Sequence, residues 1–495
     1  MTNTDTSTRV PTKAFQPSWE SVSTRSLPVW FDDAKVGIFL HWGLYSVPAW
    51  APPVENIQAL LKAGGPKEMF RMNPYAEWYL NSMQVDGNPT QEHHREVWGA
   101  GFPYDGFRPI FDEGSATADL DALASLCRDA GANYVVLTTK HHEGFTLWPA
   151  SIPHPVKGYY HAQRDLVGDL TDAVRAHGMR MGLYYSGGYD WPYNNAVLRA
   201  AADAALAIPS EPSYVAYATA HVRELIDRYA PSVLWNDIAW PGGSNLAELF
   251  AHYYNTVEDG VINDRWHESG RRDGMTDTLA KVGGELVQRL WRFIPDDKKE
   301  LTFPGAHHYD FNTPEYTQFD DIVTKKWEAT RGVGHSFGAN HNERPEDIVT
   351  TTELVRSLCD IVSKNGNLLI GIGPSPDGQI PPEQQKPVLG MGRWLATHGE
   401  GIYGTRPWTQ AATTTTEGTE VRFTTRERTV YAHLIDLPGR PDFGLRGVNA
   451  RSVNGVRLLG VDEAITWKLD GDQLVVDLPE RLPVAPVHTL AIEGL

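Results

Sequence analysis

The chain has little cysteine and no long hydrophobic run. Its 495 residues include two cysteines, Cys127 and Cys359, each in an apolar stretch with helical spacing. Two isolated thiols argue against a disulfide framework or a cysteine metal site, so we expect both to lie in the core. No run of about 18 apolar residues occurs, and the polar start, residues 1–6, lacks the basic and apolar segments of a secretory signal. We therefore expect a cytoplasmic protein without a membrane partner.

Positive charge is also scarce. The formal net charge is -18 and the pI is near 5.4, so the average surface repels polyanions and a nucleic-acid partner is not expected. Hydrophobic residues make up 41% and charged residues 21%, which is an ordinary globular balance. The length suffices for a barrel of about 250 residues with insertions and an appended module.

A common nucleotide-binding motif is missing. No Gly-x-Gly-x-x-Gly opens a helix after the first strand, which leaves a dinucleotide site unsupported. What is present is a series of strands that alternate with helical segments and lack hairpin signals, the pattern of βαβ units. The expected strands are 35–40, 134–139, 181–186, 233–237, 260–266 and 367–373. Because chemistry-bearing residues follow these strands at their carboxyl ends, the pattern favours a (β/α) barrel over a doubly wound sheet.

The pattern of expected strands and helices divides the chain into segments. Residues 1–27 are a polar N-terminal segment, and residues 28–408 are the expected barrel domain, with a loop-rich part at 51–115. A charged insertion at about 267–306 lacks the alternation of strands and helices expected for a barrel, and is interpreted as a lid or contact element. From 409 to 495, short alternating runs separated by Gly, Pro and Asp turns predict an antiparallel β-sandwich.

Polar and aromatic side chains gather at the expected strand ends. They are His41, Trp42, His141, His142, Tyr184, Trp235, Asp237, Asp264 and Arg265. Neutral donors, rings and few acids suit a sugar better than a phosphate. Three histidines and an aspartate could also ligate a metal, but no His-x-His or His-Glu-x-x-His spacing occurs among them. His141 and His142 are adjacent, so both can point to one site only where the strand has become a loop.

Hydrolysis of a glycoside requires two carboxyl groups, one ionised and one that donates a proton. Asp237 ends the strand Val233-Leu234-Trp235-Asn236-Asp237 and supplies the first, although it could instead cap the following turn. The candidates for the second are Glu268, Glu285, Glu315, Glu328 and Glu343.

Seven segments together resemble the α-L-fucosidases of glycoside hydrolase family 29, over roughly residues 28 to 408. The segments are Gly37 to Trp42, Thr138 to Phe145, Arg164 to Gly168, Leu183 to Gly188, Leu234 to Asp237, Asn263 to Trp266 and Val362 to Asn367. The resemblance implies a (β/α)8-like barrel followed by a C-terminal antiparallel β-sandwich. It also implies a mechanism that needs no cofactor and no metal.

The resemblance assigns roles to single residues. Asp237 matches the family's nucleophile, and Glu315, within Asp310-Phe311-Asn312-Thr313-Pro314-Glu315-Tyr316, matches its acid/base, with Glu268 as the alternative. Phe337 is the candidate contact for the C6 methyl group, although core packing would also explain it. The other residues expected around the sugar are His41, Glu77, Trp78, His141, His142, Tyr184, Trp235 and Arg265.

These expectations add up to a retaining exo-α-L-fucosidase that acts on fucosylated oligosaccharides or glycosides. Two alternatives remain: an α-L-galactosidase, for which Phe337 would be badly placed, and a sugar-binding protein that has lost turnover. The sequence leaves open the linkage preference, transfer to acceptors other than water, and whether the chain forms a homo-oligomer.

Overall fold

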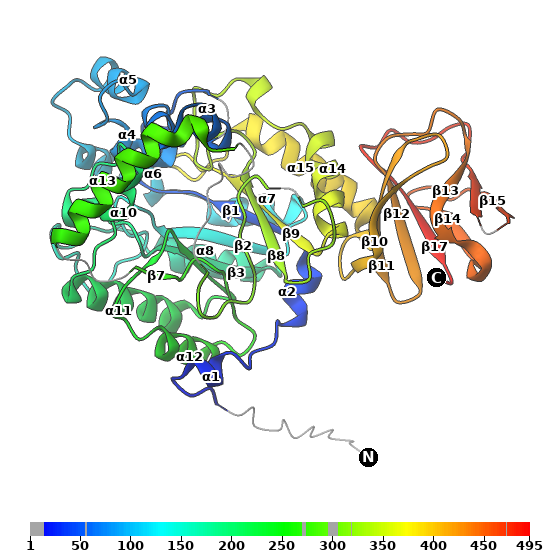
Figure 1. Cartoon of the computed structure of the whole chain (residues 1–495), viewed down its shortest axis with the longest axis horizontal. Helices are drawn as coiled ribbons and strands as arrows, with labels where there is room; N and C mark the ends of the chain where they lie inside the picture. The colour runs from blue at the N-terminus through cyan, green and yellow to red at the C-terminus, as the bar shows by residue number, and fades with distance from the viewer. Residues whose placement is uncertain (1–13, 55–56, 270–273, 296–304, 318, 472) are drawn as a thin grey trace.

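The computed structural model describes residues 14–54, 57–269, 274–295, 305–317, 319–471 and 473–495 (Figure 1). Of the N-terminal segment 1–27, residues 1–13 lie outside this range, and the described part contains the short helix α1 Trp19–Val22. Within the described range, a large domain of mixed helices and strands is followed by a smaller domain of antiparallel strands. In the part of the chain described, no helix is both long enough and apolar enough to cross a membrane.

A curled parallel sheet forms the centre of the large domain. Its seven strands run in the order β6-β4-β3-β2-β1-β9-β8, and every neighbouring pair is parallel. Their bounds are β1 Val36–Leu40, β2 Tyr134–Lys140, β3 Arg180–Ser186, β4 Val233–Asp237, β6 Val261–Ile262, β8 Trp327–Gly332 and β9 Gly366–Ile372. The apolar runs in the sequence are continuous because both faces of these strands are buried.

The gap between β6 and β8 is filled by an extended segment rather than a regular strand. Phe311 bridges Asn263 just after β6, and Asn312 bridges Trp327 at the start of β8. Glu315, farther along the same segment, bridges Thr330. The segment therefore completes the ring of the expected (β/α)8-like barrel and carries Glu315 toward its rim.

Helices cover the outside of the sheet between successive strands. They are α7 Leu120–Asp129, α8 Leu166–Ala176, α11 Pro212–Tyr229, α12 Leu246–Thr256, α14 Thr351–Ser363 and α15 Pro382–His398. Local signals set their ends: the Asp119 side chain caps α7 by accepting from Ala122 N, and Gly131, with φ of 87°, follows its last turn. Cys127 and Cys359 are buried on α7 and α14, as expected.

The stretch expected to be loop-rich is mostly helical. Between residues 51 and 115 lie α3 Ile57–Arg71, α4 Tyr79–Ser82, α5 Pro89–Val97 and α6 Phe107–Ala116. The many Gly and Pro residues concealed these helices, because Gly65 and Pro66 kink α3 in the middle and Pro89 starts α5. The expected strand at 260–266 is short, and β8 was not expected.

The insertion at 267–306 contains β7 Glu268–Ser269, the helix α13 Gly274–Leu290 and a 3-10 turn, η4 Trp291–Phe293. Figure 1 shows α13 passing beside α10, Ala201–Leu206, toward α3, and both helices contact it.

The C-terminal domain consists of two antiparallel sheets. Five strands run in the order β10-β11-β12-β17-β14 and three in the order β13-β16-β15. The bounds are β10 Arg406–Thr414, β11 Glu420–Arg426, β12 Thr429–Leu434, β13 Asp442–Asn449, β14 Gly455–Leu458, β15 Thr466–Asp470, β16 Gln473–Asp477 and β17 His488–Glu493. Side chains from both sheets share one apolar core, and α14 packs against β10 and β11.

Candidate active site

A cavity of about 220 Å³ opens at the carboxyl ends of the barrel strands. All of the residues to which the family resemblance assigns a role line it: His41, Glu77, Trp78, His141, His142, Tyr184, Trp235, Asp237, Arg265, Glu315 and Phe337. The strands converge at this edge, which brings residues from across the chain together.

Asp237 lies at the end of β4 and is held by three donors. Tyr184 OH donates to Oδ2 at 2.8 Å, while Arg265 Nη1 and Ile238 N each donate to Oδ1 at 2.8 Å. The bond from Ile238 is a local contact with the turn that follows β4, of the kind weighed in the sequence, and Asp237 also lines the cavity. These donors stabilise an ionised, oriented carboxylate at the cavity surface.

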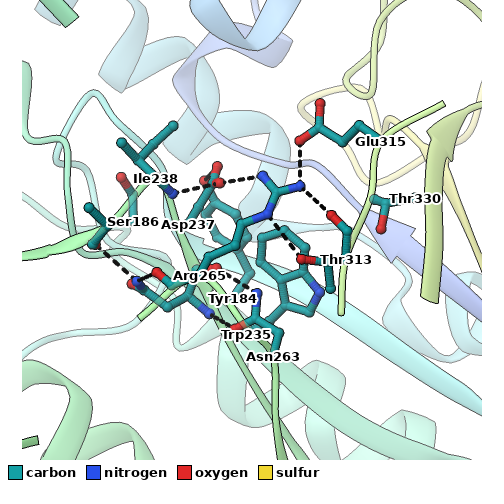
Figure 2. Close-up of polar contacts among 12 residues, drawn as sticks. Tyr184, Ser186, Trp235, Asp237, Ile238, Asn263, Arg265, Thr313, Glu315 and Thr330 are labelled. Atoms are coloured by element: carbon teal, nitrogen blue, oxygen red, sulfur yellow. Dashed lines mark hydrogen bonds and ion pairs between the residues drawn. The ribbon is translucent and has the colours of Figure 1, made fainter. Parts of the chain in front are cut away.

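Arg265 joins the two carboxyl groups, as Figure 2 shows. Its Nη1 contacts Asp237 and its Nη2 contacts Glu315 Oε1 at 2.7 Å. Thr313, on the segment that closes the barrel, accepts from Arg265 Nε at 3.0 Å and from Nη2 through its carbonyl at 2.9 Å. Arg265 is 2% exposed, and the nearby carboxylates keep its pKa above the ordinary value despite burial. One buried guanidinium therefore fixes both acids.

The two adjacent histidines point into the same cavity because β2 ends at Lys140, before both of them. His142 Nδ1 lies 2.7 Å from Ser186 Oγ, whose hydrogen is already donated to Tyr189 O at 2.9 Å. Nδ1 must then be the donor, which leaves Nε2 as an acceptor that faces Asp237 Oδ2 at 3.8 Å. Burial, aided by His141, holds the pKa of His142 well below its usual value, so this ring is neutral.

A buried ion pair supports the loop beneath His142. Lys140 Nζ lies 3.1 Å from Asp190 Oδ2, and Asp190 Oδ1 contacts His154 Nε2 at 2.8 Å. Lys140 Nζ also donates to the carbonyl of Ser186 at 2.8 Å. These contacts fix the 186–191 loop that orients the imidazole.

Glu77 and Phe337 lie close together at the cavity. Glu77 is buried, and Gly338 N, next to Phe337, donates to its Oε2 at 3.0 Å. Burial raises the pKa of Glu77, and His141 opposes that rise. Phe337 lies with its ring centre 5.0 Å from that of His41. It both packs in the core and faces the cavity, as an apolar contact requires.

Aromatic rings form the floor of the site. The Trp235 and Tyr184 rings stack with centroids 5.4 Å apart, and the Arg265 guanidinium lies 4.8 Å from the centre of the Trp235 ring. Beneath them, Glu328 on β8 accepts from Trp235 Nε1 at 3.1 Å and from Tyr134 OH. Glu328 is thus a support in the barrel interior and does not line the cavity.

Comparison with known proteins identifies the family. The model "Alpha-L-fucosidase" matches residues 2–400, and "Alpha-L-fucosidase C-terminal domain" matches residues 412–493. The chain belongs to the α-L-fucosidase family. This is a family of glycoside hydrolases, which agrees with the resemblance found in the sequence motifs.

Individual members of the family are similar over nearly the whole chain. The tissue α-L-fucosidase of Bos taurus is 30% identical, covering 95% of this chain and 88% of its own. The α-L-fucosidase of Dictyostelium discoideum is 32% identical, covering 87% of this chain and 82% of its own. The crystal structure of Thermotoga maritima α-fucosidase in complex with fucose is 37% identical with a TM-score of 0.79, covering 97% of this chain and 100% of its own.

Several strand-end and glutamate candidates lie outside the cavity. Trp42 Nε1 donates to Ser375 O at 2.9 Å, and Asp264 Oδ1 accepts from Thr313 Oγ1 at 2.6 Å, which orients the Thr313 segment. Glu268 is exposed and accepts from Ser244 Oγ at 3.2 Å. Glu343 accepts from two backbone N–H groups of the loop at Phe337. The geometry therefore favours Glu315 over Glu268 as the partner of Asp237.

Some cavity residues had no place in the sequence prediction. Tyr75 OH donates to Glu315 Oε2 at 3.4 Å. Because Tyr75 is only two residues before the predicted Glu77, the sequence could have indicated that it lies at the site. The remaining cavity residues are Phe39, Ile57, Met69, Phe70, Tyr189, Ala204, Ile238 and Thr330. Most are apolar, and four of the eight come from α3 and α10, where nothing in the sequence marks them as more than core.

Proposed function

We propose that the protein is a retaining exo-α-L-fucosidase that removes terminal α-L-fucosyl residues from glycosides by double displacement. The observation that carries the proposal is the placement of Asp237 and Glu315 on one buried guanidinium at the cavity surface. Retaining enzymes hold their carboxyl groups about 5–5.5 Å apart, and a shared arginine keeps a pair close together.

In the first step, a carboxylate oxygen of Asp237 attacks the anomeric carbon while Glu315 donates its proton to the leaving oxygen. The bond to the leaving group breaks, and a β-linked fucosyl ester forms on Asp237. In the second step, Glu315 takes a proton from water, which attacks the same carbon and releases α-L-fucose. Two inversions give overall retention, and Asp237 is regenerated as a carboxylate.

The rest of the cavity fits a 6-deoxy sugar. Glu77, His142 and Tyr184 offer acceptors and donors for ring hydroxyls. Phe337 offers an apolar contact for the C6 methyl group, whereas the extra hydroxyl of galactose would lose its hydration there without a partner on that ring. This contrast favours an α-L-fucoside over an α-L-galactoside.

The first test compares 4-nitrophenyl α-L-fucoside with the α-L-galactoside and the β-D-galactoside, with the released anomer followed by proton NMR. We expect hydrolysis of the fucoside and initial release of the α anomer. Initial release of the β anomer would refute double displacement. A folded protein that binds fucose but turns over none of the three would be a binding protein.

The second test assigns the two acids. Asp237→Asn should lose several orders of magnitude in kcat with its fold intact, and near-normal turnover would refute its role as nucleophile. Glu315→Ala should lose far more activity on substrates with poor leaving groups than on aryl fucosides, and azide should restore part of the loss. Glu268→Ala is the matched control, because Glu268 is exposed and outside the cavity. Equal losses on both substrate types for Glu315→Ala would remove it from the mechanism.

A further inference from the structure

The cavity has a second, apolar part that the sugar-binding residues do not account for. Its lining includes Ile57, Met69 and Phe70 from α3, Ala204 from α10, and Ile238. We call these five residues the apolar wall. A fucosyl ring offers one methyl group, and Phe337 already provides a contact for it. The wall is therefore more apolar surface than the sugar requires.

The inserted helix α13 and its 3-10 turn hold α3 in its kinked shape. Gly65, with φ of 75°, and Pro66 interrupt the helical hydrogen bonds of α3. Trp291 Nε1 donates to the carbonyl of Leu61, in the first half of α3, at 2.7 Å. Gln288 Oε1 accepts from Lys67 N at 3.2 Å, and its Nε2 donates to Gly64 O at 3.1 Å. Backbone groups left unpaired by the kink are satisfied by the insertion, which fixes both halves of α3.

The same insertion holds α10. Gly284 of α13 approaches Ala202 so closely that a Cβ at Gly284 would lie 2.8 Å from the Ala202 Cβ. Gly65 is similarly close to Trp291, where an added Cβ would lie 2.9 Å from the ring. Both helices that carry the wall therefore make tight contacts with one insertion, as their arrangement in Figure 1 shows.

The part of the chain that carries most of the wall leads directly to the acid/base candidate. The segment that continues from α3 carries Tyr75, whose hydroxyl reaches Glu315 at 3.4 Å. The residues that can bind sugar hydroxyls come mostly from the strand ends, whereas α3 and α10 are outside the barrel at the cavity rim. A leaving group bound to the oxygen next to Glu315 would contact these helices.

We propose that the apolar wall is a binding site for an apolar leaving group, an alkyl or aryl alcohol, and that α13 maintains it. This inference rests on the proposed fucosidase function and specifies its substrate class. Burial of a methylene in such a site favours binding of the transition state by about fourfold. The natural substrates are then fucosides whose aglycone presents a hydrocarbon face next to the glycosidic oxygen.

The experiment compares kcat/KM for methyl and n-butyl α-L-fucoside. Both leaving alcohols have nearly the same acidity, so the chemical step is matched and only apolar area differs. We expect the butyl fucoside to be at least about tenfold better, since burial of part of its three additional methylenes suffices. Equal kcat/KM values would overturn the inference alone. No turnover of either substrate would overturn the proposed function as well.

Variants test the part played by the insertion. Gln288→Ala and Trp291→Ala should lower the ratio of butyl to methyl kcat/KM at least about threefold, while the inhibition constant of free L-fucose stays unchanged. Leu286→Ser is the matched control, because this α13 residue is 55% exposed, and its ratio should equal that of the wild type. An equal loss in the control, or a parallel weakening of fucose inhibition, would overturn the assignment.

A variant in the apolar wall itself tests the inference even if Gln288→Ala and Trp291→Ala fail to fold. Met69→Gln retains the length of the side chain and introduces an amide beside the leaving group. We expect the butyl-to-methyl ratio to fall toward one, with near-UV circular dichroism like that of the wild type. A ratio unchanged in folded Met69→Gln would overturn the role of the wall.

Discussion

Glu328 allows the electrostatics of the barrel interior to be tested with a single isosteric change. Its carboxyl group is fully buried below the site and has two neutral donors, Tyr134 and Trp235, as hydrogen-bond partners. Burial raises its pKa from an ordinary value of 4.5 to about 7. Glu328→Gln keeps the shape and can accept from Trp235 while donating to Tyr134, so the fold should be retained.

Proton binding at Glu328 makes the free energy of unfolding of the wild type depend on pH. Between the two pKa values the folded state binds a proton at Glu328 that the unfolded state has lost, so the wild type loses stability as the pH rises. We take a pKa of 4.5 for Glu328 in the unfolded chain and about 7 in the folded protein. The free energy of unfolding of the wild type then falls by about 2.5 kcal/mol between pH 5 and pH 8. Glu328→Gln does not titrate and should escape this loss.

The assay is denaturant unfolding of both proteins at a series of pH values, followed by tryptophan fluorescence. The free energy of unfolding of Glu328→Gln minus that of the wild type should increase by about 2.5 kcal/mol from pH 5 to pH 8. Glu268→Gln, a change on an exposed carboxylate, should show no comparable trend. A flat difference for Glu328→Gln would refute the raised pKa. Infrared spectra give an independent check, since the difference between the spectra of the wild type and Glu328→Gln should contain a protonated carboxyl band that disappears above neutral pH.

Two further changes test the charged contacts around the site. In Arg265→Lys, a single ammonium group replaces the two guanidinium nitrogens that contact Asp237 and Glu315. We therefore expect kcat to fall by about 10- to 100-fold. An unchanged kcat in steady-state kinetics would contradict the bridging role. Lys140→Met leaves Asp190 buried without its cation, which should lower the free energy of unfolding in denaturant by about 3–5 kcal/mol. The double variant with Asp190→Asn should recover part of this loss. No recovery would show that the broken ion pair is not the cause.

Much of the fold follows from local sequence patterns. The strand 233–237 was predicted with the bounds it has, because a continuous apolar run bounded by turn residues specifies a buried parallel strand. Strand β8 was missed because its sequence, Trp327 to Gly332, includes Glu328 and Arg331, and the local pattern does not reveal the distant hydrogen-bond partners, Tyr134 and Trp235, of the buried Glu328. The helices between 51 and 115 were missed because Gly65 and Pro66 are helix breakers whose effect here is confined to a kink.

The sequence by itself determined the chemistry available at the strand ends. Asp237, His142 and Tyr184 each follow or end a strand, and parallel strands must place their carboxyl ends at one edge. The residue pattern left several glutamates as partners for Asp237, and only the family resemblance favoured Glu315, because Glu315 comes after the insertion and reaches the site on the segment that closes the barrel. The tertiary structure alone showed the single guanidinium that joins the two acids and the apolar wall held by α13, since each depends on contacts between residues far apart in the chain.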